Sequence, residues 1–489
     1  MSARKHQSLI TLLGASLSMG GCVAESDIGA SGRLDTEGKQ SIIAGLSYDA
    51  RAAVADLDGD GLDDLVVWTN EGQTRGAVGG FVGDPPAVRI YYGDRAGLRE
   101  QGSPTDADVV LTARDGEFIA SVMGEDLDGD GAAELVVHAG VESSHDVVRQ
   151  PHVESGSFPL GSEGSVYVVS GGPRPASPAD LAVVGTRTPS YALGAGLPLR
   201  VGLPPRDLDG AAGDEYLSLA PMELADANSA IFVQSMGTGD VRATLTLGER
   251  GSIVPRAVFD QDGDGNADVA VLYVKAPMGS VLSTENWAEY GIGIFYGPLA
   301  EDVALGEVGT VAIALPAPVR GADSYFLGML VDGDLRATVG TFLDGAAPDL
   351  ILTAVRQFMV ILPGGPGRAP TPMIGSGPGS YSTPWPMDGG GPQTTLLAPG
   401  QAIDNGDALF ILRESAVAVI ELFEVLSATL LYTPEANASA PPPMLPFFTE
   451  GGAALGDLDG DGALDLVLST RPREGETESR VHVLYGFEG

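Results

Sequence analysis

The stretch Asp56-Leu57-Asp58-Gly59-Asp60-Gly61-Leu62-Asp63-Asp64 (DLDGDGLDD) decides the fold, because close copies of it return three more times. The copies begin at Asp126 (DLDGDGAAE), Asp260 (DQDGDGNAD) and Asp457 (DLDGDGALD). Each has carboxylates at positions 1, 3, 5 and 9 and a glycine at position 6, which permits a sharp turn. One such stretch would be typical of an acidic surface turn, but four matched copies favour metal binding. Hard oxygen ligands in this spacing predict about four Ca²⁺ sites.

The predicted side-chain ligands are the same four positions in every copy. They are Asp56, Asp58, Asp60 and Asp64; Asp126, Asp128, Asp130 and Glu134; Asp260, Asp262, Asp264 and Asp268; and Asp457, Asp459, Asp461 and Asp465. An EF-hand loop would end in a glutamate at position 12, where these copies have Val67, Val137, Val271 and Leu468. Short apolar runs precede each loop and β-branched runs follow it, which predicts a strand, a calcium loop and a strand.

The repeats predict an all-β chain of seven units. The first and last complete loops begin at Asp56 and Asp457, and this separation along the sequence fits six intervals of about 67 residues each. A damaged copy, DLDGAAGDE, keeps Asp207, Asp209 and Glu215 but has Ala211 at position 5, and residues 342–353 and 402–412 keep only the strand and the turn. Four short strands per unit favour a seven-bladed β-propeller of four-stranded antiparallel blades, with the calcium loops between strands 1 and 2. A linear β-solenoid is the alternative.

Residues 118–131, followed by Gly164 to Gly172 (GSVYVVSGG), resemble the FG-GAP (VCBS-like) repeat of the integrin α-subunit propeller. The resemblance covers about residues 42–489 and is strongest in units one, two, four and seven; unit two has Ile119 where the family has a glycine. It implies a seven-bladed propeller in which loop position 7 adds a backbone carbonyl ligand. In this chain the carbonyl donors would be Leu62, Ala132, Asn266 and Ala463.

The N-terminal residues predict export and a lipid anchor. Residues 1–21 combine two early basic residues, an apolar core and a small-residue end, which is the layout of a signal peptide. Met19-Gly20-Gly21-Cys22 resembles a bacterial lipobox, so Cys22, the only cysteine, would carry the lipid. Residues 22–40 would form a flexible tether to a propeller at 41–489. We expect a location in the bacterial cell envelope, on the outer membrane or cell surface; an ordinary cleaved signal is the alternative.

Composition restricts the partners. The formal net charge of −39 argues against nucleic acid, which requires a basic surface. Residues 363–392 are rich in proline and glycine and predict a flexible insertion outside the blades. The long connections at residues 70–87, 140–164 and 276–291 would lie on the face opposite the calcium loops. We expect a protein or glycan ligand there, membrane contact through the lipid only, and a monomer.

The sequence contains no convincing catalytic constellation. It has no HExxH, GxSxG or phosphate-binding glycine motif, so we predict no catalytic residues and no organic cofactor. His138, His145 and His152 recur at seven-residue intervals, but solvated loop histidines are the simpler interpretation. The leading hypothesis is a non-catalytic recognition or adhesion propeller. A hydrolase or lyase acting on extracellular polymer and a scaffold subunit of an envelope complex are the alternatives.

A count of strands predicts how the ring closes. Unit seven ends after its third strand, at about residues 480–485, so its outer strand is missing. The only unassigned apolar run before unit one is Ser41-Ile42-Ile43-Ala44. We therefore predict that this run pairs antiparallel with residues 480–485 and that both ends of the chain share one blade.

Overall fold

In the computed structural model, nearly all secondary-structure elements of the described residues are β-strands. It describes residues 40–46, 50–69, 86–113, 117–141, 164–174, 191–192, 203–211, 213–219, 230–236, 238–249, 251–275, 289–314, 335–343, 347–354, 358–368, 370, 373–374, 393–398, 408–413, 419–424, 429–432, 448–470 and 478–487. One short 3-10 turn, Pro104–Asp106, is the only helical element in these ranges. No helix in them is long and apolar enough to cross a membrane. The predicted signal peptide, Cys22 and the tether up to residue 39 lie outside them.

The strands form seven separate sheets. The first contains β2 (Arg51–Ala55), β3 (Asp64–Thr69), β4 (Ala87–Tyr91) and β6 (Val109–Thr112). The second contains β7 (Glu117–Glu125), β8 (Glu134–Val141), β9 (Gly164–Val169) and β10 (Tyr191–Ala192), and the third β11 (Glu215–Leu219), β12 (Ile231–Ser235), β13 (Val241–Thr246) and β17 (Val303–Ala304). The fourth contains β14 (Gly251–Phe259), β15 (Asp268–Lys275), β16 (Glu289–Phe295) and β18 (Thr310–Ala314).

The remaining sheets follow the same order. The fifth contains β19 (Leu335–Gly340), β20 (Asp349–Ala354), β21 (Phe358–Leu362) and β22 (Met373–Ile374), and the sixth β23 (Gln393–Ala398), β24 (Ala408–Arg413), β25 (Val419–Glu424) and β26 (Thr429–Tyr432). The seventh contains β27 (Phe448–Gly456), β28 (Leu464–Thr470) and β29 (Ser479–Phe487), to which β1 (Gln40–Leu46) and β5 (Gln101–Gly102) add.

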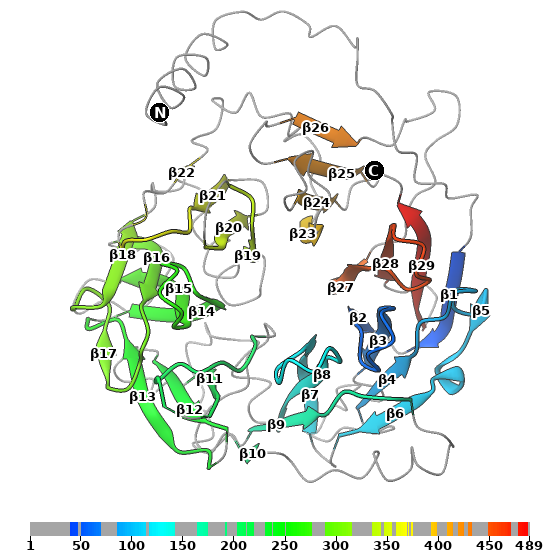
Figure 1. The fold of residues 1–489 in the computed structure, drawn as a ribbon, viewed down its shortest axis with the longest axis horizontal. Coiled ribbons are helices and arrows are strands. Elements are labelled where there is room, and N and C mark those ends of the chain that lie inside the picture. The colour runs from blue at the N-terminus through cyan, green and yellow to red at the C-terminus, as the bar shows by residue number, and fades with distance from the viewer. Residues whose placement is uncertain are drawn as a thin grey trace, which may run out of the picture.

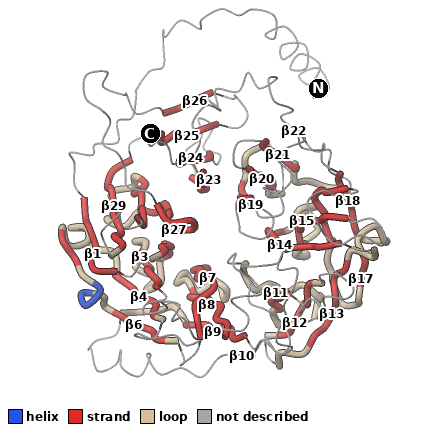
Figure 2. Tube along the Cα trace, turned by 180° about the vertical axis from the view of Figure 1, so that it is seen from behind, coloured by secondary structure: helices blue, strands red, loops and turns tan. Residues whose placement is uncertain are grey.

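The sheets stand side by side around a common centre, with β2, β7, β14, β19, β23 and β27 on the inside (Figure 1). The same ring is seen from behind in Figure 2. The first strands of successive sheets contact one another: β27 with β2, β2 with β7, β14 with β19, and β19 with β23. This is the arrangement of a β-propeller, in which closure of the ring leaves only short sheet edges exposed.

The hydrophobic core lies between the sheets, because the central strands are buried on both faces. All six residues of β3 are buried. Val66 and Trp68 pack toward the second sheet, against residues such as Leu135 and Tyr167. Leu65 and Val67, which point the opposite way, join Val483 and other residues of the seventh sheet. A central strand that is covered by a neighbouring sheet on each face therefore has a continuous run of apolar residues. A strand with one face in water would instead alternate apolar and polar residues.

The predicted closure of the ring is confirmed. β1 pairs antiparallel with β29, with Ile42 opposite His482 and Ile43 opposite Val481. The Ser41 hydroxyl donates to the Leu98 carbonyl oxygen at 2.8 Å and lies 3.2 Å from the Tyr485 hydroxyl, so the added strand is also held by the first sheet. Ile43 and Leu46 are buried.

Several outer strands differ from the sequence prediction. In the second sheet the outer strand is β10. The apolar run Leu181-Ala182-Val183-Val184, which the sequence favours as the fourth strand of this unit, lies outside the described residues. In the fifth sheet the outer strand is β22, which lies within residues 363–392, so the prediction that this segment lies outside the blades is wrong for its first part. Two-residue strands such as these carry no hydrophobic pattern that sequence analysis can detect.

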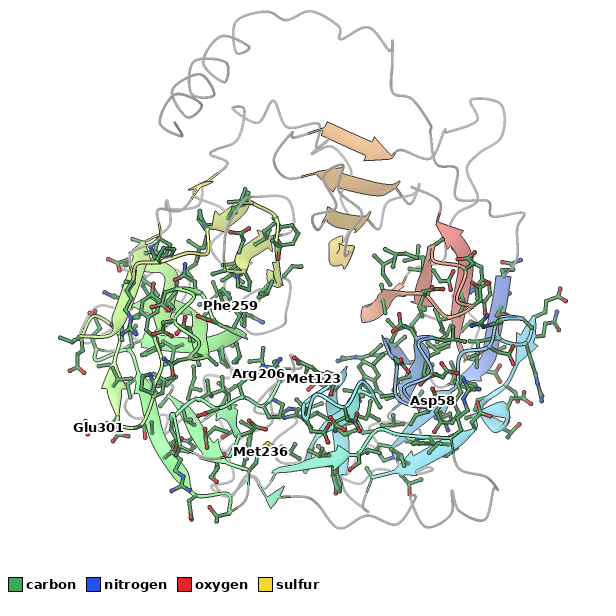
Figure 3. All side chains as sticks on the ribbon, in the orientation of Figure 1. Asp58, Met123, Arg206, Met236, Phe259 and Glu301 are labelled. Carbon is green, nitrogen blue, oxygen red and sulfur yellow. The ribbon has the colours of Figure 1, made fainter. Side chains whose placement is uncertain are left out.

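Two further strands connect neighbouring sheets. In the sequence β5 lies between two strands of the first sheet, β4 and β6, but it pairs in parallel with β1 at the edge of the seventh sheet. In the same way β17 lies between β16 and β18 of the fourth sheet in the sequence, but it pairs in parallel with β13 of the third. At the inner side, Arg206 forms an ion pair with Glu125 of β7, and Figure 3 places Arg206 beside Met123 of the same strand. The sheets are thus joined by backbone and side-chain contacts as well as by apolar packing.

Candidate metal centres

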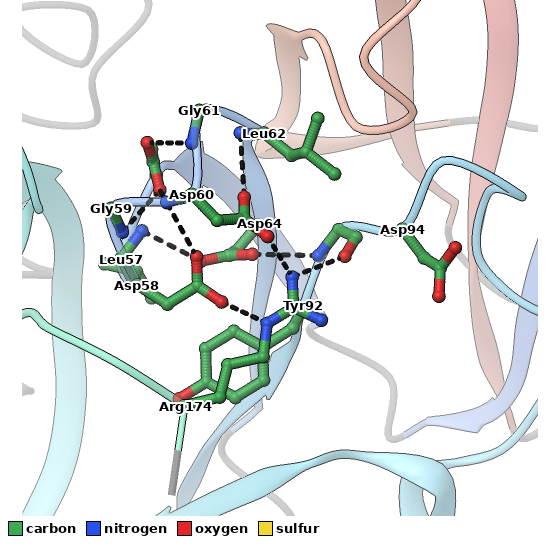
Figure 4. A network of polar contacts seen from close by, with 12 residues as sticks. Leu57, Asp58, Gly59, Asp60, Gly61, Leu62, Asp64, Tyr92, Asp94 and Arg174 are labelled. Atoms are coloured by element: carbon green, nitrogen blue, oxygen red, sulfur yellow. Dashed lines mark hydrogen bonds and ion pairs between the residues drawn. The ribbon is translucent and has the colours of Figure 1, made fainter.

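Each complete loop folds around its first carboxylate. Asp56 Oδ1 accepts the Gly59 N–H at 2.8 Å, and Asp56 Oδ2 accepts the Gly61 N–H at 2.9 Å (Figure 4). Gly61 has a φ of 85°, which other residues rarely adopt. Asp126, Asp260 and Asp457 accept the same two N–H groups in their own loops. The Asp-Gly spacing thus fixes one loop conformation four times.

The folded loops bring three carboxylates together. Oxygen atoms of positions 1, 3 and 9 lie within 4.8 Å of one another in each complete loop: Asp56, Asp58 and Asp64; Asp126, Asp128 and Glu134; Asp260, Asp262 and Asp268; and Asp457, Asp459 and Asp465. The predicted position 5 ligands, Asp60, Asp130, Asp264 and Asp461, are not part of these groups. Each instead accepts the N–H of position 7 through its Oδ1 atom, at 2.8 to 2.9 Å. The carbonyl donors that the resemblance implies at Leu62, Ala132, Asn266 and Ala463 stay a prediction.

Position 9 also supports the backbone. Asp64 accepts the Leu57 N–H and the Gly93 N–H, both at 2.8 Å, and so joins the loop to the end of the third strand. Glu134, Asp268 and Asp465 make the same pair of bonds in their sheets. A Cβ atom on Gly93 would lie 2.5 Å from the Asp63 carbonyl oxygen, so this close approach requires glycine.

Burial makes these carboxylates costly to charge. Desolvation raises the pKa of Asp64 to about 7, that of Asp268 to about 6 and that of Asp465 to about 7, although backbone hydrogen bonds act in the opposite direction. Clustered, partly dehydrated carboxylates are stable in the charged form when a cation lies among them. The donor set consists of carboxylate oxygens, which fits Ca²⁺ better than a soft metal.

Two degenerate units keep part of the design. In the third unit Asp207, Asp209 and Glu215 come within the same 4.8 Å limit, although Ala211 removes the position 5 carboxylate. In the fifth unit only the ninth carboxylate remains: Asp349 accepts the N–H groups of Phe342, Leu343 and Gly364. The loss of ligands in that unit was predicted, whereas the retained structural role of Asp349 was not.

The loops also join each sheet to the next. The carbonyl oxygens of positions 1 and 2 accept N–H groups from the following sheet, and these contacts recur around the ring. They are Asp457 with Asp63, Asp56 with Ala133, Leu458 with Asp94, Leu57 with Gly172, Leu208 with Leu299, and Gln261 with Gly365. The loop conformation therefore influences the contact between sheets as well as the site itself.

The histidine prediction is wrong for one residue. His138 lies in β8 and is 1% exposed, so it is not a solvated loop histidine. Its two ring nitrogens have no hydrogen-bond partner among the described residues, and burial lowers its pKa to about 4. His145 and His152 lie outside the described residues, as do most of the three long connections that we expect on the opposite face.

Comparison with known proteins identifies no family. No family model matches the chain, and no curated protein matches it. Among similar solved structures, BBS1N in complex with ARL6DN is 11% identical over 92% of this chain and 98% of that chain, with a TM-score of 0.37. The exotype rhamnogalacturonan lyase YesX is 14% identical (91% of this chain, 66% of that chain, TM-score 0.30). A Trypanosoma rangeli sialidase in complex with sialic acid is 9% identical (94% and 58%, TM-score 0.36).

Proposed function

We propose that this chain is a calcium-stabilised, seven-bladed β-propeller that serves recognition or adhesion without catalysis. The observation that supports calcium most directly is the repeated grouping of three carboxylates within 4.8 Å, at least one of them buried, in four loops of the same conformation. Bound Ca²⁺ would supply positive charge to these groups, and the residues at positions 1, 3 and 9 would hold it. The joints between sheets would then be strengthened by the ion.

The proposed location is the bacterial cell envelope, through a lipid on Cys22 followed by a tether. The support is the sequence pattern of residues 1–40 alone. Replacing Cys22 by Ser is expected to release the protein from the membrane fraction or to block its maturation. A processed Cys22→Ser protein that still fractionates with membranes would contradict the anchor.

The ligand class that we propose is a protein or glycan bound on the face opposite the calcium loops by a monomer. Arrays of glycans and peptides, probed with the folded body in calcium and in EDTA, are expected to show calcium-dependent binding. The enzymatic alternative predicts cleavage of a bound polymer, which an assay for new reducing or unsaturated ends on the same ligands would reveal.

Calcium removal is the direct test of the metal proposal. We expect the unfolding midpoint to fall in EDTA and to recover in about 10 mM Ca²⁺, because extracellular sites of this kind bind at roughly 10⁻⁴ to 10⁻³ M. Each occupied site at ten times its dissociation constant adds about 1.4 kcal/mol to the free energy of unfolding. Mg²⁺ should restore less, since it requires a smaller octahedral shell.

Variants in single loops show which of the proposed sites binds Ca²⁺. Asp459→Ala is expected to remove one bound ion in a calcium titration, whereas Asp209→Ala should change the count and the midpoint much less, because its loop already lacks a position 5 carboxylate. An unchanged midpoint in EDTA, with elemental analysis showing no residual metal, would contradict the calcium proposal.

A further inference from the structure

The loops are numbered here by unit, so loop one is residues 56–64, loop two is residues 126–134 and loop four is residues 260–268. Loop one receives an arginine from the following sheet. Arg174, which follows β9, donates from Nε to Asp58 Oδ2 and from Nη2 to Asp60 Oδ2 at 2.7 Å (Figure 4). Its Nη2 also donates to the Gly93 carbonyl oxygen at 2.7 Å. One guanidinium thus binds positions 3 and 5 of the loop and the end of the third strand in the same sheet as the loop.

Loop four repeats this contact atom for atom. Arg368, from the sheet that follows, donates from Nε to Asp262 Oδ2 and from Nη2 to Asp264 Oδ2, each at 3.0 Å. Its Nη2 donates to the Gly297 carbonyl oxygen at 3.2 Å. The two arginines stand at different distances from the glycine that ends the third strand, in GGPR at residues 171–174 and GGPGR at 364–368. Two different turns that reach one geometry indicate a specific site rather than a chance ion pair.

An aromatic ring completes each arginine site. The Arg174 guanidinium lies 4.9 Å from the centre of the Tyr92 ring, and that of Arg368 lies 5.2 Å from the Tyr296 ring. Both tyrosines stand directly before the glycine that bonds the ninth carboxylate. Stacking of this kind attracts the guanidinium to the ring face and restricts its position.

Loop two differs on both sides. Ser170 occupies the place of the tyrosine before Gly171, and the segment at the end of the third strand of the following sheet, SMGTGD at residues 235–240, contains no arginine. Within the part of the chain that the structure describes, Asp128 and Asp130 accept hydrogen bonds only from the backbone of their own loop. The tyrosine and the arginine are therefore present together in loops one and four and absent together in loop two.

The charge balance follows from these contacts. The Asp58 side chain is 2% exposed and that of Asp262 is 6% exposed, so both need a nearby cation. In loops one and four the guanidinium supplies one positive charge and occupies an oxygen of position 3, a proposed calcium ligand, and an oxygen of position 5. Loop two has no such contact among the described residues, and its Asp128 is exposed, so water or an ion offsets the charge there. Affinity at Ca²⁺ loops depends on the number of charges and on the rigidity of the ligands.

We infer that Arg174 and Arg368 are positioning residues that set loops one and four apart from loop two. Loops one and four keep their shape and their contact with the next sheet without an ion, and they bind Ca²⁺ more weakly. Loop two binds Ca²⁺ more tightly and loses its shape when the ion leaves. This inference rests on the proposed calcium function and specifies how it is distributed around the ring.

The test compares Arg368→Gln with Arg368→Lys and with Arg99→Gln in the full chain. Arg99 is a matched control, because it forms an ion pair with Asp106 at 2.7 Å and neither residue belongs to a proposed calcium loop. Calcium titration by calorimetry is expected to show one site that becomes about three- to tenfold tighter in Arg368→Gln, since one competing charge is removed. The unfolding midpoint of that variant should fall by several degrees in EDTA and by less in saturating calcium. Arg368→Lys, which keeps the charge but not the two-point contact, should be intermediate.

Two results would overturn the inference while leaving the calcium proposal intact. Equal losses of stability in EDTA and in calcium, with unchanged affinities, would mean that the arginine only holds two sheets together. Weaker calcium binding in Arg368→Gln would mean that the arginine orients the ligands instead of competing for them. If wild type and Arg99→Gln bind no Ca²⁺ at 10 mM, the calcium proposal fails and this inference fails with it. If Arg368→Gln does not fold even in calcium, calcium titration of Arg368→Lys decides by the same criteria.

Discussion

Asp349 separates two roles that the ninth loop residue combines elsewhere. It accepts three backbone N–H groups, at 2.7 to 3.0 Å, and is fully buried, but its loop has Thr341 and Leu343 at positions 1 and 3. Asp268 makes the equivalent backbone bonds in a loop with all its carboxylates. The ninth carboxylate is thus a structural support in every one of these units, and the proposed metal site would give it a second role in some of them.

We predict that Asp349→Asn lowers the free energy of unfolding by about 1 to 2 kcal/mol, because an amide can accept only part of the backbone bonds. The loss should be the same in EDTA and in calcium, as measured by urea denaturation. Asp268→Asn is the comparison: it should lose a similar amount in EDTA, because it breaks the equivalent backbone bonds, and more in calcium, because it also removes a proposed ligand. Equal behaviour of the two variants would contradict the separation of roles.

His138 predicts a loss of stability in acid. Its side chain is buried and burial lowers its pKa to about 4, whereas in the unfolded chain it would titrate near 6.5. Between these values the unfolded state binds the proton and the folded state does not, so stability is complete above about pH 6.5 and falls toward pH 4. The full loss is on the order of 3 kcal/mol.

The measurement is urea denaturation of wild type and His138→Phe at pH 7.5 and pH 5, both in excess calcium. The difference in unfolding free energy between the two proteins should shift in favour of the variant at the lower pH. A constant difference would show that His138 remains neutral in both states or becomes hydrated on protonation.

Sequence reasoning succeeds for residues whose role is local and fails for those whose partners are distant. The loop aspartates act through spacings of a few residues. Positions 1, 3 and 9 of the DLDGDG repeat therefore lie together as the spacing predicted, whereas position 5 is outside the group and metal binding stays a prediction. Arg174 lies 116 residues from Asp58, and Arg368 lies 106 residues from Asp262. Only the order of the sheets brings these pairs together, and no motif around either arginine indicates it.

Among the strands, β1 is the one that closes the ring by joining the two ends of the chain in one sheet. It pairs with β29 on one side and with β5 on the other, and Tyr485 binds both Ser41 and the Leu98 N–H. The missing strand in unit seven was predicted by counting apolar runs, whereas β5 and β17 were not, because two residues cannot show an alternating pattern. Their positions follow from the packing of one sheet against another.

Removal of β1 is predicted to be far more costly than removal of the tether. A protein lacking residues 23–46 should unfold at a clearly lower urea concentration than one lacking residues 23–38, because it loses the buried Ile43 and Leu46 and exposes the edge of β29. Burial of these two side chains alone corresponds to about 3 to 6 kcal/mol. Both deletions are made in a chain that also lacks residues 1–22, so neither variant has the signal peptide or Cys22 and the comparison isolates the strand. Similar midpoints would show that closure does not depend on β1.

At the scale of the whole molecule, the contacts between sheets have one direction. The turn after the third strand of one sheet bonds to the loop of the preceding sheet, as Gly172 does with Leu57 and Gly365 with Gln261. The arginines follow the same direction. Each sheet is therefore held by the next one along the chain. In a chain of formal charge −39, an arginine offsets carboxylates at two of these joints, and at the others the proposed Ca²⁺ would do so.

The pairing of β1 with β29 also determines when the ring can first form during protein synthesis. About 430 residues separate the two strands, and at roughly 5 to 20 residues per second a ribosome needs about 20 to 90 seconds to pass from one to the other. Throughout that interval β1 has no partner strand from the seventh sheet, so the nascent chain carries an apolar, unpaired segment at its start. Cells that make this protein must therefore keep that segment from aggregating until the last strand has been translated.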